Sequence, residues 1–250
     1  MKSPRAAIVL AAGQGKRMKS NLAKALHRLA GKPLIDHVIS RLSDLGLSRF
    51  VVVVGHQGES VEKHLRKTFP ELDLKIAWQK ERRGTGHAVL MAREHVADFD
   101  GSVLVAACDV PCISPDSLKQ LVELHEENGG GATCLSANFA DPTGYGRVVR
   151  GENTDRLLRI VEQRDASEEI RRIKEISSGL FVFDSRRLFT ALDQVTDDNT
   201  QGELYLTDVI GIMASQDIAC YVSRVADPDE VRGVNSLDQL KELEAIFARS

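Results

Sequence analysis

Short apolar runs alternate with longer amphipathic stretches through the first half of the chain. The runs are rich in Val, Ile, Leu and Ala and are bounded by glycine, proline or charged residues, a pattern typical of buried β-strands. In the stretches between them, apolar residues recur three or four positions apart, which predicts amphipathic helices. The predicted strands are Ala6–Leu10, Arg49–Gly55, Leu74–Gln79 and Ser102–Asp109, and the predicted helices are 33–45, 59–69 and 84–96.

This alternation of strand and helix predicts an α/β fold with a mostly parallel, Rossmann-like sheet flanked by helices. Ligands of such sheets bind outside the carboxyl ends of the strands. Three distinctive segments follow predicted strands: a basic loop after the first, residues 79–85 after the third, and Asp109 at the end of the fourth. We therefore expect these three segments to meet at one site.

Beyond residue 130 the pattern changes to shorter β-like runs separated by turn residues. These runs predict a mixed-sheet extension that covers the pocket, rather than a second doubly wound unit. We expect a nucleotide-binding part over residues 1–130 and the extension over 131–225, within one domain that spans 1–235. The run 168–175 has opposite charges at helical spacing and predicts a solvated helix, and Ser236 is placed to cap a C-terminal helix over 236–250.

Composition narrows the function classes. The 250 residues carry a formal charge of −3 with a pI near 6.2, which disfavours a nucleic-acid partner because such proteins usually show a basic excess. No apolar run approaches the ~20 residues needed to cross a bilayer, so we expect no membrane partner. The four cysteines lack the paired spacing of a zinc site, and we expect a cytoplasmic protein with reduced thiols.

The loop after the first strand reads LAAGQGKRMKSNLAK and spans Leu10–Lys24. Glycines let the backbone approach an anion closely, and the four basic residues complement phosphate charge. The spacing excludes a Walker loop, and Met18 stands where a dinucleotide fingerprint needs glycine or alanine. Taken alone, the loop has two interpretations: a phosphate site of another class, or an ordinary surface turn.

Seven spaced motifs together resemble one family over nearly the whole chain. They resemble the uridylyltransferase (pyrophosphorylase) domain of bacterial bifunctional N-acetylglucosamine-1-phosphate enzymes, within the sugar-phosphate nucleotidyltransferases. The motifs are LAAGQGKRM (10–18) with Lys24, GKPL (31–34), QKERRGTGHA (79–88), the Asp109-Val110-Pro111 turn, DPTGYGRV (141–148), IVEQRDA (160–166), and GELYLTD (202–208) with GVN (233–235).

The resemblance implies a nucleotide-diphospho-sugar transferase fold and an enzyme that joins UTP to a sugar 1-phosphate with Mg²⁺, releasing pyrophosphate. It implies Arg17 and Lys24 as the catalytic residues on the triphosphate, and Asp109 and Asn235 as the magnesium ligands. The implied nucleotide-binding residues are Leu10, Ala11, Ala12, Gly13, Gln79, Gly84 and Thr85. The implied sugar-binding positions are Gly146, Glu162, Ser177, Tyr205 and Thr207.

The implied chemistry explains these residue types. A sugar phosphate is already an anionic nucleophile, so the obstacle to attack on a triphosphate is charge repulsion rather than the lack of a base. Positive charge from Arg17, Lys24 and a metal lowers that barrier. Mg²⁺ prefers oxygen ligands and keeps several waters, so one carboxylate and one amide are a sufficient protein contribution. Cys108 is expected beside the metal, either as a reactive thiol or as a buried and inert one.

Several positions depart from the family pattern. Lys16 stands in place of Thr, Ala23 in place of Pro, Ala107-Cys108 in place of Tyr-Gly, and Ser177 in place of an Asn that contacts the sugar. The residue roles that the resemblance implies therefore carry over better on the nucleotide side than on the sugar side. The sequence ends within what would be the helical arm, so we expect no acetyltransferase β-helix and a monomer or weak homo-oligomer.

Three alternatives remain beside a uridylyltransferase. The first is an enzyme of the same fold that uses another nucleotide, such as CTP or dTTP. The second is a glycosyltransferase, which commonly holds its metal through D-x-D, whereas Asp109 is followed by Val110-Pro111. The third is a non-catalytic protein that binds nucleotide or nucleotide sugar, which the altered sugar pocket favours and the retained basic and metal residues oppose.

Overall fold

The four strands predicted in the first half of the chain form one parallel sheet. The computed structural model describes residues 6–47, 49–151 and 156–247. In it β1 (Ala6–Ala11) lies between β4 (Arg49–Val54) and β6 (Ser102–Ala107), and β4 also pairs with β5 (Leu74–Trp78), all in parallel. The predicted α/β fold with a mostly parallel sheet flanked by helices is confirmed.

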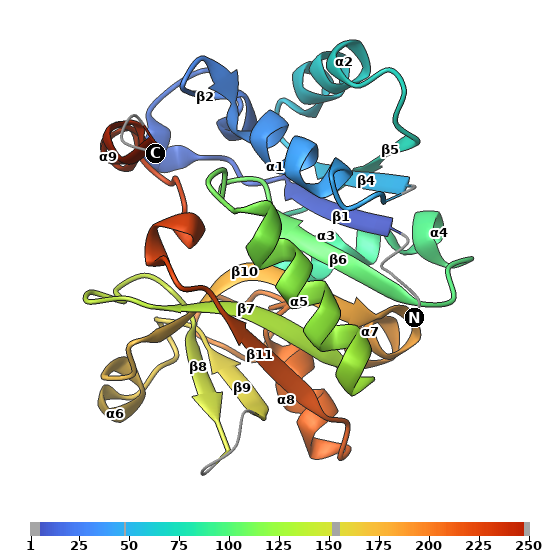
Figure 1. Cartoon of the computed structure of the whole chain (residues 1–250), viewed down its shortest axis with the longest axis vertical. Helices are drawn as coiled ribbons and strands as arrows, with labels where there is room; N and C mark the ends of the chain where they lie inside the picture. The colour runs from blue at the N-terminus through green and yellow to red at the C-terminus, as the bar shows by residue number, and fades with distance from the viewer. Residues whose placement is uncertain (1–5, 48, 152–155, 248–250) are drawn as a thin grey trace.

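The strands of the second half continue this sheet rather than forming a separate one. Figure 1 shows β10 (Glu175–Asp184) beside β6, followed by β7 (Ala132–Asn138) and β11 (Cys220–Arg224), in the order β11-β7-β10-β6-β1-β4-β5. β10 is antiparallel to both neighbours, which makes the sheet mixed. β8 (Arg147–Arg150) and β9 (Leu157–Val161) leave this row as an antiparallel pair. The expected division between residues 130 and 131 stays a prediction.

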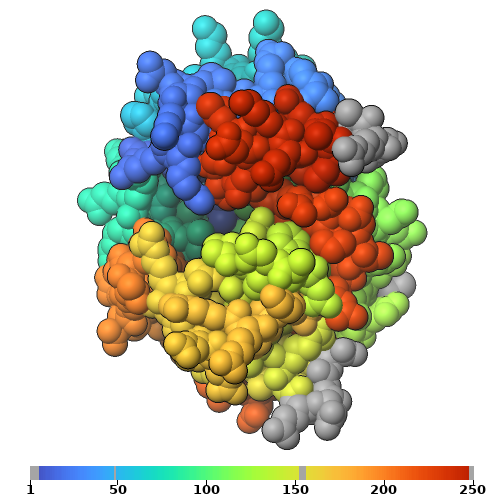
Figure 2. Space-filling model, turned by 90° about the vertical axis from the view of Figure 1, so that its left-hand side faces the viewer, coloured from blue at the N-terminus to red at the C-terminus, as the bar shows by residue number. Residues whose placement is uncertain are grey.

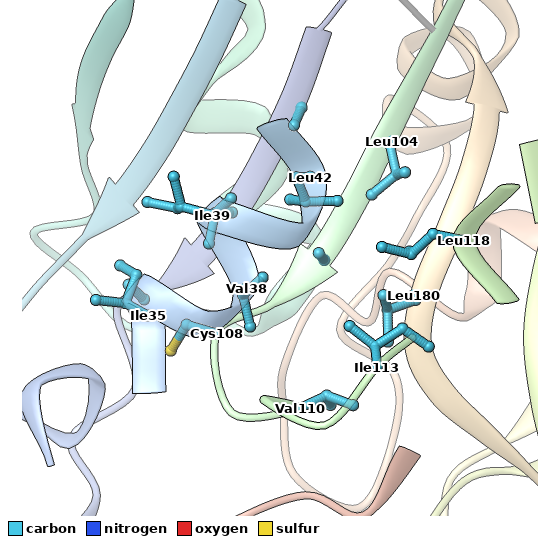
Figure 3. Close-up of a cluster of buried hydrophobic side chains, with 14 of the residues drawn as sticks. Ile35, Val38, Ile39, Leu42, Leu104, Cys108, Val110, Ile113, Leu118 and Leu180 are labelled. Atoms are coloured by element: carbon cyan, nitrogen blue, oxygen red, sulfur yellow. The ribbon is translucent and has the colours of Figure 1, made fainter. Parts of the chain in front are cut away.

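Helices cover both faces of the sheet because successive strand residues point to opposite sides. Val52 and Leu104 pack with α1, α2 and α5 on one face, while Val51 and Val103 pack with α3, α7 and α8 on the other. Figure 3 shows the apolar side of α1 facing the end of β6. The helices are α1 (Leu34–Ser43), α2 (Gly58–Thr68), α3 (Thr85–Met91), α4 (Arg93–Val96), α5 (Pro115–Asn128), α6 (Glu168–Arg171), α7 (Ser185–Leu192), α8 (Asp208–Ser215) and α9 (Leu237–Phe247).

Two predicted helices differ in the structure. The helix predicted over 84–96 is divided at Ala92, whose N–H donates to Val89 O three residues back in a tight turn. The helix predicted over 168–175 ends at Arg171, and its last residue, Glu175, begins β10. Glu175 is therefore not on a solvated helix face: its side chain is 11% exposed and paired with Arg150.

The C-terminal helix α9 packs against the basic loop near the N-terminus. Leu240 and Leu243 of α9 form a small buried cluster with Met18, Leu29 and Leu34. Figure 1 shows α9 beside the segment that carries β2 (Arg28–Leu29). The predicted cap is present, since Ser236 Oγ accepts a hydrogen bond from Gln239 N (3.2 Å). The segment after β1 and the C-terminal helix thus support each other by apolar packing.

A partly buried ion pair holds the β8–β9 pair to the main sheet. Arg150 at the end of β8 donates to both carboxylate oxygens of Glu175 (2.6 and 2.7 Å), and Ser136 Oγ of β7 donates to Glu175 Oε1 (2.6 Å). Burial alone raises the pKa of Glu175, but the hydrogen bonds from Arg150 and Ser136 outweigh it, so the pKa lies below its usual value. The Glu175 carboxylate thus links three strands, β7, β8 and β10, through side-chain hydrogen bonds.

We expect Glu175→Gln to lower the free energy of unfolding by about 1–3 kcal/mol at pH 7, because it removes charge-assisted hydrogen bonds. A group with a lowered folded pKa stabilises the fold above its unfolded pKa and loses that effect as the pH falls through the folded value. The difference from wild type should therefore shrink below about pH 4.5 in urea titrations. Glu123→Gln, on an exposed side chain, is the control, and an equal loss in both variants would contradict the assignment.

Candidate functional site

Two adjoining cavities open at the carboxyl ends of β1 and β6. Their volumes are 270 and 240 Å³, and Leu10, Thr85, Ala107 and Asp109 line both. Figure 2 shows a hollow on this face, between the blue N-terminal segment, the red C-terminal segment and the yellow segments of the second half. A larger cavity of 610 Å³, near Phe139 and Asp227, is lined by none of the predicted site residues.

The first cavity gathers most of the predicted nucleotide-binding residues and is called the nucleotide-side cavity below. Its lining includes Leu10, Ala12, Gly13, Lys24, Gln79, Gly84, Thr85 and Asp109. Ala11 does not line it, because Ala11 is the last residue of β1 and packs into the core. Three motifs distant in sequence therefore meet at this cavity, as their positions after strands predict.

The wall of the nucleotide-side cavity at Gly84 requires glycine. Gly84 has φ +100°, and a Cβ there would lie 2.4 Å from Leu204 O. Leu204 N donates to Arg83 O (2.7 Å), and Gly86 N donates to Leu204 O (2.8 Å). Leu206 N in turn donates to Thr85 Oγ1 (3.0 Å). These contacts join the GTG motif to the segment 203–206 and fix the backbone that lines the cavity.

The basic loop folds back so that its two halves touch. Gly15 has φ +60°, and a Cβ on it would lie 2.9 Å from Lys24 Cβ, so only glycine allows this approach. Met18 N donates to Gly15 O (2.7 Å), and the Met18 side chain is buried beneath α9. This packing directs Lys24 toward the end of β6.

Lys24 meets Asp109 and Asn235 at the boundary between the two cavities. Lys24 Nζ donates hydrogen bonds to Asp109 Oδ2 (2.5 Å) and to Asn235 Oδ1 (2.7 Å). The Lys24 side chain is 11% exposed and that of Asp109 is 17% exposed. Val234 N donates to Asp109 O (2.9 Å), which fixes the chain before Asn235 against the end of β6. The two predicted metal residues are therefore brought together on one cationic atom.

This donor set fits Mg²⁺. A carboxylate oxygen and an amide oxygen converge on a positive charge, and both are hard donors of the kind that magnesium prefers. Within the described ranges, no three His, Cys, Asp or Glu side chains gather into a closed metal site. A metal ion held by Asp109 and Asn235 would complete its shell with water and substrate oxygens.

The second cavity gathers most of the predicted sugar-binding residues and is called the sugar-side cavity. Its lining includes Arg17, Asp109, Gly146, Glu162, Ser177, Thr207 and Asn235. Tyr205 does not line it: its side chain faces a neighbouring cavity of 400 Å³ that shares Glu162 and Thr207, and its hydroxyl accepts from Gln201 Nε2 (2.7 Å). Arg17 makes no hydrogen bond or ion pair with the described part of the chain, so its guanidinium is available to an anionic ligand.

Glu162 is a half-buried carboxylate that lines the sugar-side cavity. Thr207 Oγ1 donates to its Oε1 (3.0 Å), and burial raises the pKa of Glu162 although this hydrogen bond opposes the shift. A Cβ on Gly146 would lie 2.9 Å from Ile160 Cγ2 and 3.5 Å from Glu162 Oε1. The absence of a side chain at Gly146 leaves room for a ligand hydroxyl beside the carboxylate.

Cys108 lies beside Asp109 at the site, as its position in the sequence predicts, but its thiol is held in the protonated, unreactive form. It lines the nucleotide-side cavity at 6% exposure, and Figure 3 shows it among the apolar side chains of α1. Burial, together with the charge of Asp109, raises the pKa of Cys108 to about 12. Because the thiolate is the reactive form, this favours the buried and inert alternative.

Comparison with known proteins identifies the family. Residues 7–208 match the MobA-like NTP transferase domain. The chain belongs to this family of NTP transferases. The family resemblance and the nucleotidyltransferase class predicted from the sequence are thereby confirmed.

The similar curated proteins are longer than this NTP transferase chain. It is 43% identical over 97% of its length to the bifunctional protein GlmU of Streptococcus mutans and 44% identical over 96% to that of Staphylococcus haemolyticus. The chain spans about half the length of these relatives, 52% in each case.

Solved structures confirm the fold of the NTP transferase chain. A UDP-glucose pyrophosphorylase complexed with UDP-glucose superimposes with a TM-score of 0.81 at 18% identity, covering 98% of this chain and 99% of that one. The inositol-1-phosphate CTP transferase from T. maritima gives a TM-score of 0.73 at 17% identity, covering 98% and 96%. No helix of the described residues is long and apolar enough to span a membrane.

Several residues that line the site of this NTP transferase were not predicted. Arg82 and Glu203 line the nucleotide-side cavity, and Tyr145 lines the sugar-side cavity while its hydroxyl accepts from Gly233 N (3.2 Å). Each of these residues lies inside one of the seven motifs, and that membership is the sequence signal that could have indicated a place at the site. Their side chains could not be placed without the tertiary contacts between motifs.

Proposed function

We propose that this chain transfers a uridylyl group from UTP to a sugar 1-phosphate, such as N-acetylglucosamine 1-phosphate, and releases pyrophosphate in a Mg²⁺-dependent reaction. One observation carries the proposal: the basic residues and the Asp109–Asn235 pair stand where the two cavities meet. A nucleotide in one cavity and a sugar phosphate in the other would bring their phosphates together at that boundary.

The reaction needs neutralisation of the phosphate charges rather than a general base. A phosphate oxygen of the sugar 1-phosphate attacks the α-phosphorus of UTP, and the bond from that phosphorus to the bridging oxygen breaks. The electron pair of the broken bond leaves with pyrophosphate. Because the sugar phosphate is already an anion, no proton must be removed from the nucleophile. The free guanidinium of Arg17 and the ammonium of Lys24 would neutralise the oxygens that gain charge. A magnesium ion held by Asp109 and Asn235 would supply Lewis-acid stabilisation of the phosphate charge.

The two cavities divide recognition between backbone and side chains. On the nucleotide side, the close contact between Gly84 and Leu204 sets the main chain that lines the cavity beside the Gln79 amide. On the sugar side, Glu162, Thr207 and Ser177 offer polar side chains to hydroxyl groups. Cytoplasmic location and oligomeric state stay predictions from the sequence.

The testing experiment is a panel of UTP, CTP, dTTP and ATP crossed with hexose and amino-sugar 1-phosphates, with Mg²⁺ and detection of pyrophosphate. We expect turnover with UTP and at least one sugar 1-phosphate. Turnover with CTP alone would support the alternative of an enzyme with the same fold that uses another nucleotide. Nucleotide binding without pyrophosphate release across the whole panel would support a non-catalytic binding protein.

We expect Asp109→Asn and Asn235→Ala to lower kcat by about a hundredfold or more, because each weakens the charge stabilisation of the transferred phosphate. The measurement is pyrophosphate release at saturating Mg²⁺, with circular dichroism to verify folding. Asp116→Asn, at an exposed position outside both cavities, is the matched control. A folded Asp109→Asn variant with near-normal turnover would show that the metal pair is assigned wrongly.

The sugar specificity is also testable by substitution. Ser177 and Ala107 both line the sugar-side cavity, and each is smaller than the family residue that it replaces. One hydrogen bond lost at a sugar costs about 1 kcal/mol, which relaxes discrimination several-fold rather than abolishing the reaction. We therefore expect Ser177→Asn with Ala107→Tyr to raise the kcat/KM ratio of N-acetylglucosamine 1-phosphate to glucose 1-phosphate.

That ratio is measured in the native protein, both single variants and the double variant. A native ratio that already favours N-acetylglucosamine 1-phosphate strongly, and that the substitutions leave unchanged, would show that other residues set the specificity.

A further inference from the structure

The Gln79 side chain is held in one orientation at the edge of the nucleotide-side cavity. Gln79 is 5% exposed, and its Nε2 donates to Gly84 O (2.9 Å). The same nitrogen lies 3.1 Å from His87 Nδ1. A backbone carbonyl can only accept a hydrogen bond, so the amide nitrogen must face Gly84 and His87.

This arrangement leaves the amide oxygen for the ligand. Both Nε2 hydrogens of Gln79 have protein acceptors, whereas Oε1 has no partner in the described part of the chain. Gln79 lines the nucleotide-side cavity, and its carbonyl end is the end left to face it. A flipped amide would place Oε1 against Gly84 O and lose that hydrogen bond. The cavity therefore presents a hydrogen-bond acceptor at this position.

His87 can accept from Gln79 only while Nδ1 carries no proton. His87 lies in the first turn of α3, and burial lowers its pKa, as does Arg83, whereas Glu81 opposes the shift. The contact with Gln79 Nε2 requires the neutral ring with its proton on Nε2, and the lowered pKa favours that neutral form. The imidazole then acts as a fixed acceptor behind the amide.

We propose that His87 is a positioning residue that fixes the Gln79 amide, so that the cavity selects a base with a ring N–H, such as uracil, over one with a ring nitrogen acceptor, such as cytosine. This inference rests on the proposed binding of a uridine nucleotide in this cavity. An acceptor oxygen pairs with the N3–H of uracil, whereas it opposes the lone pair that cytosine carries at N3. His87 acts through Gln79 and need not touch the nucleotide.

The test compares His87→Leu, which removes the acceptor, with His87→Asn, which keeps a carbonyl oxygen near the place of Nδ1. The Kd values of UTP and CTP are measured by calorimetry, and kcat and KM for both nucleotides with one sugar 1-phosphate. We expect His87→Leu to lower the UTP-to-CTP selectivity roughly five- to tenfold, mainly through weaker UTP binding and a higher KM. His87→Asn should recover most of the selectivity.

His95→Leu makes the same substitution in α4, outside both cavities, and is the matched control. If His87→Leu weakened UTP and CTP equally, or kept the wild-type selectivity, the positioning role of His87 would be overturned. Failure of the proposed function has a separate signature: a wild-type protein that binds UTP no better than CTP contradicts it, whatever the variants do.

Discussion

The site depends on one charge contact, between the Lys24 ammonium and the oxygens of Asp109 and Asn235. These residues come from the loop after β1, the end of β6 and the segment before α9, so the contact joins three parts of the chain. A carboxylate that is mostly removed from water needs a positive partner, and in this structure Lys24 provides it. The same oxygens are suitable ligands for a divalent cation. The Lys24 ammonium would therefore compete with such a cation for Asp109 and Asn235.

The two sides of this contact differ in how they are built. The nucleotide side is fixed by backbone geometry, since Gly84 tolerates no side chain against Leu204 and Gly15 tolerates none against Lys24. The sugar side relies on side chains from β10 and from the residue after β9, such as Ser177 and Glu162. The nucleotide side therefore depends on main-chain conformation, and the sugar side depends on the side chains present.

Much of the sheet and the grouping of the site could be predicted, because both follow from local pattern and parallel topology. Apolar runs mark β1, β4, β5 and β6, and the motifs after them must meet at one edge. β11 was missed because it forms by pairing with β7, which is distant in sequence. α5 was also missed, although Ser114, Pro115 and Gly129 mark its ends locally. Glu175 looked like part of a charged helix because its partner Arg150 lies 25 residues away in sequence. Tyr205 lies in a motif of the site, yet it faces the neighbouring cavity.

The most direct test of the account is Mn²⁺ binding to the nucleotide-free protein, followed by electron paramagnetic resonance. If the Lys24 ammonium occupies the cation position, Lys24→Met should bind Mn²⁺ about tenfold or more tightly than wild type, because one competing charge is removed. Adding Asp109→Asn to that variant should abolish the gain. Unchanged Mn²⁺ affinity in a folded Lys24→Met variant, or a gain that survives the loss of the Asp109 carboxylate, would contradict the account.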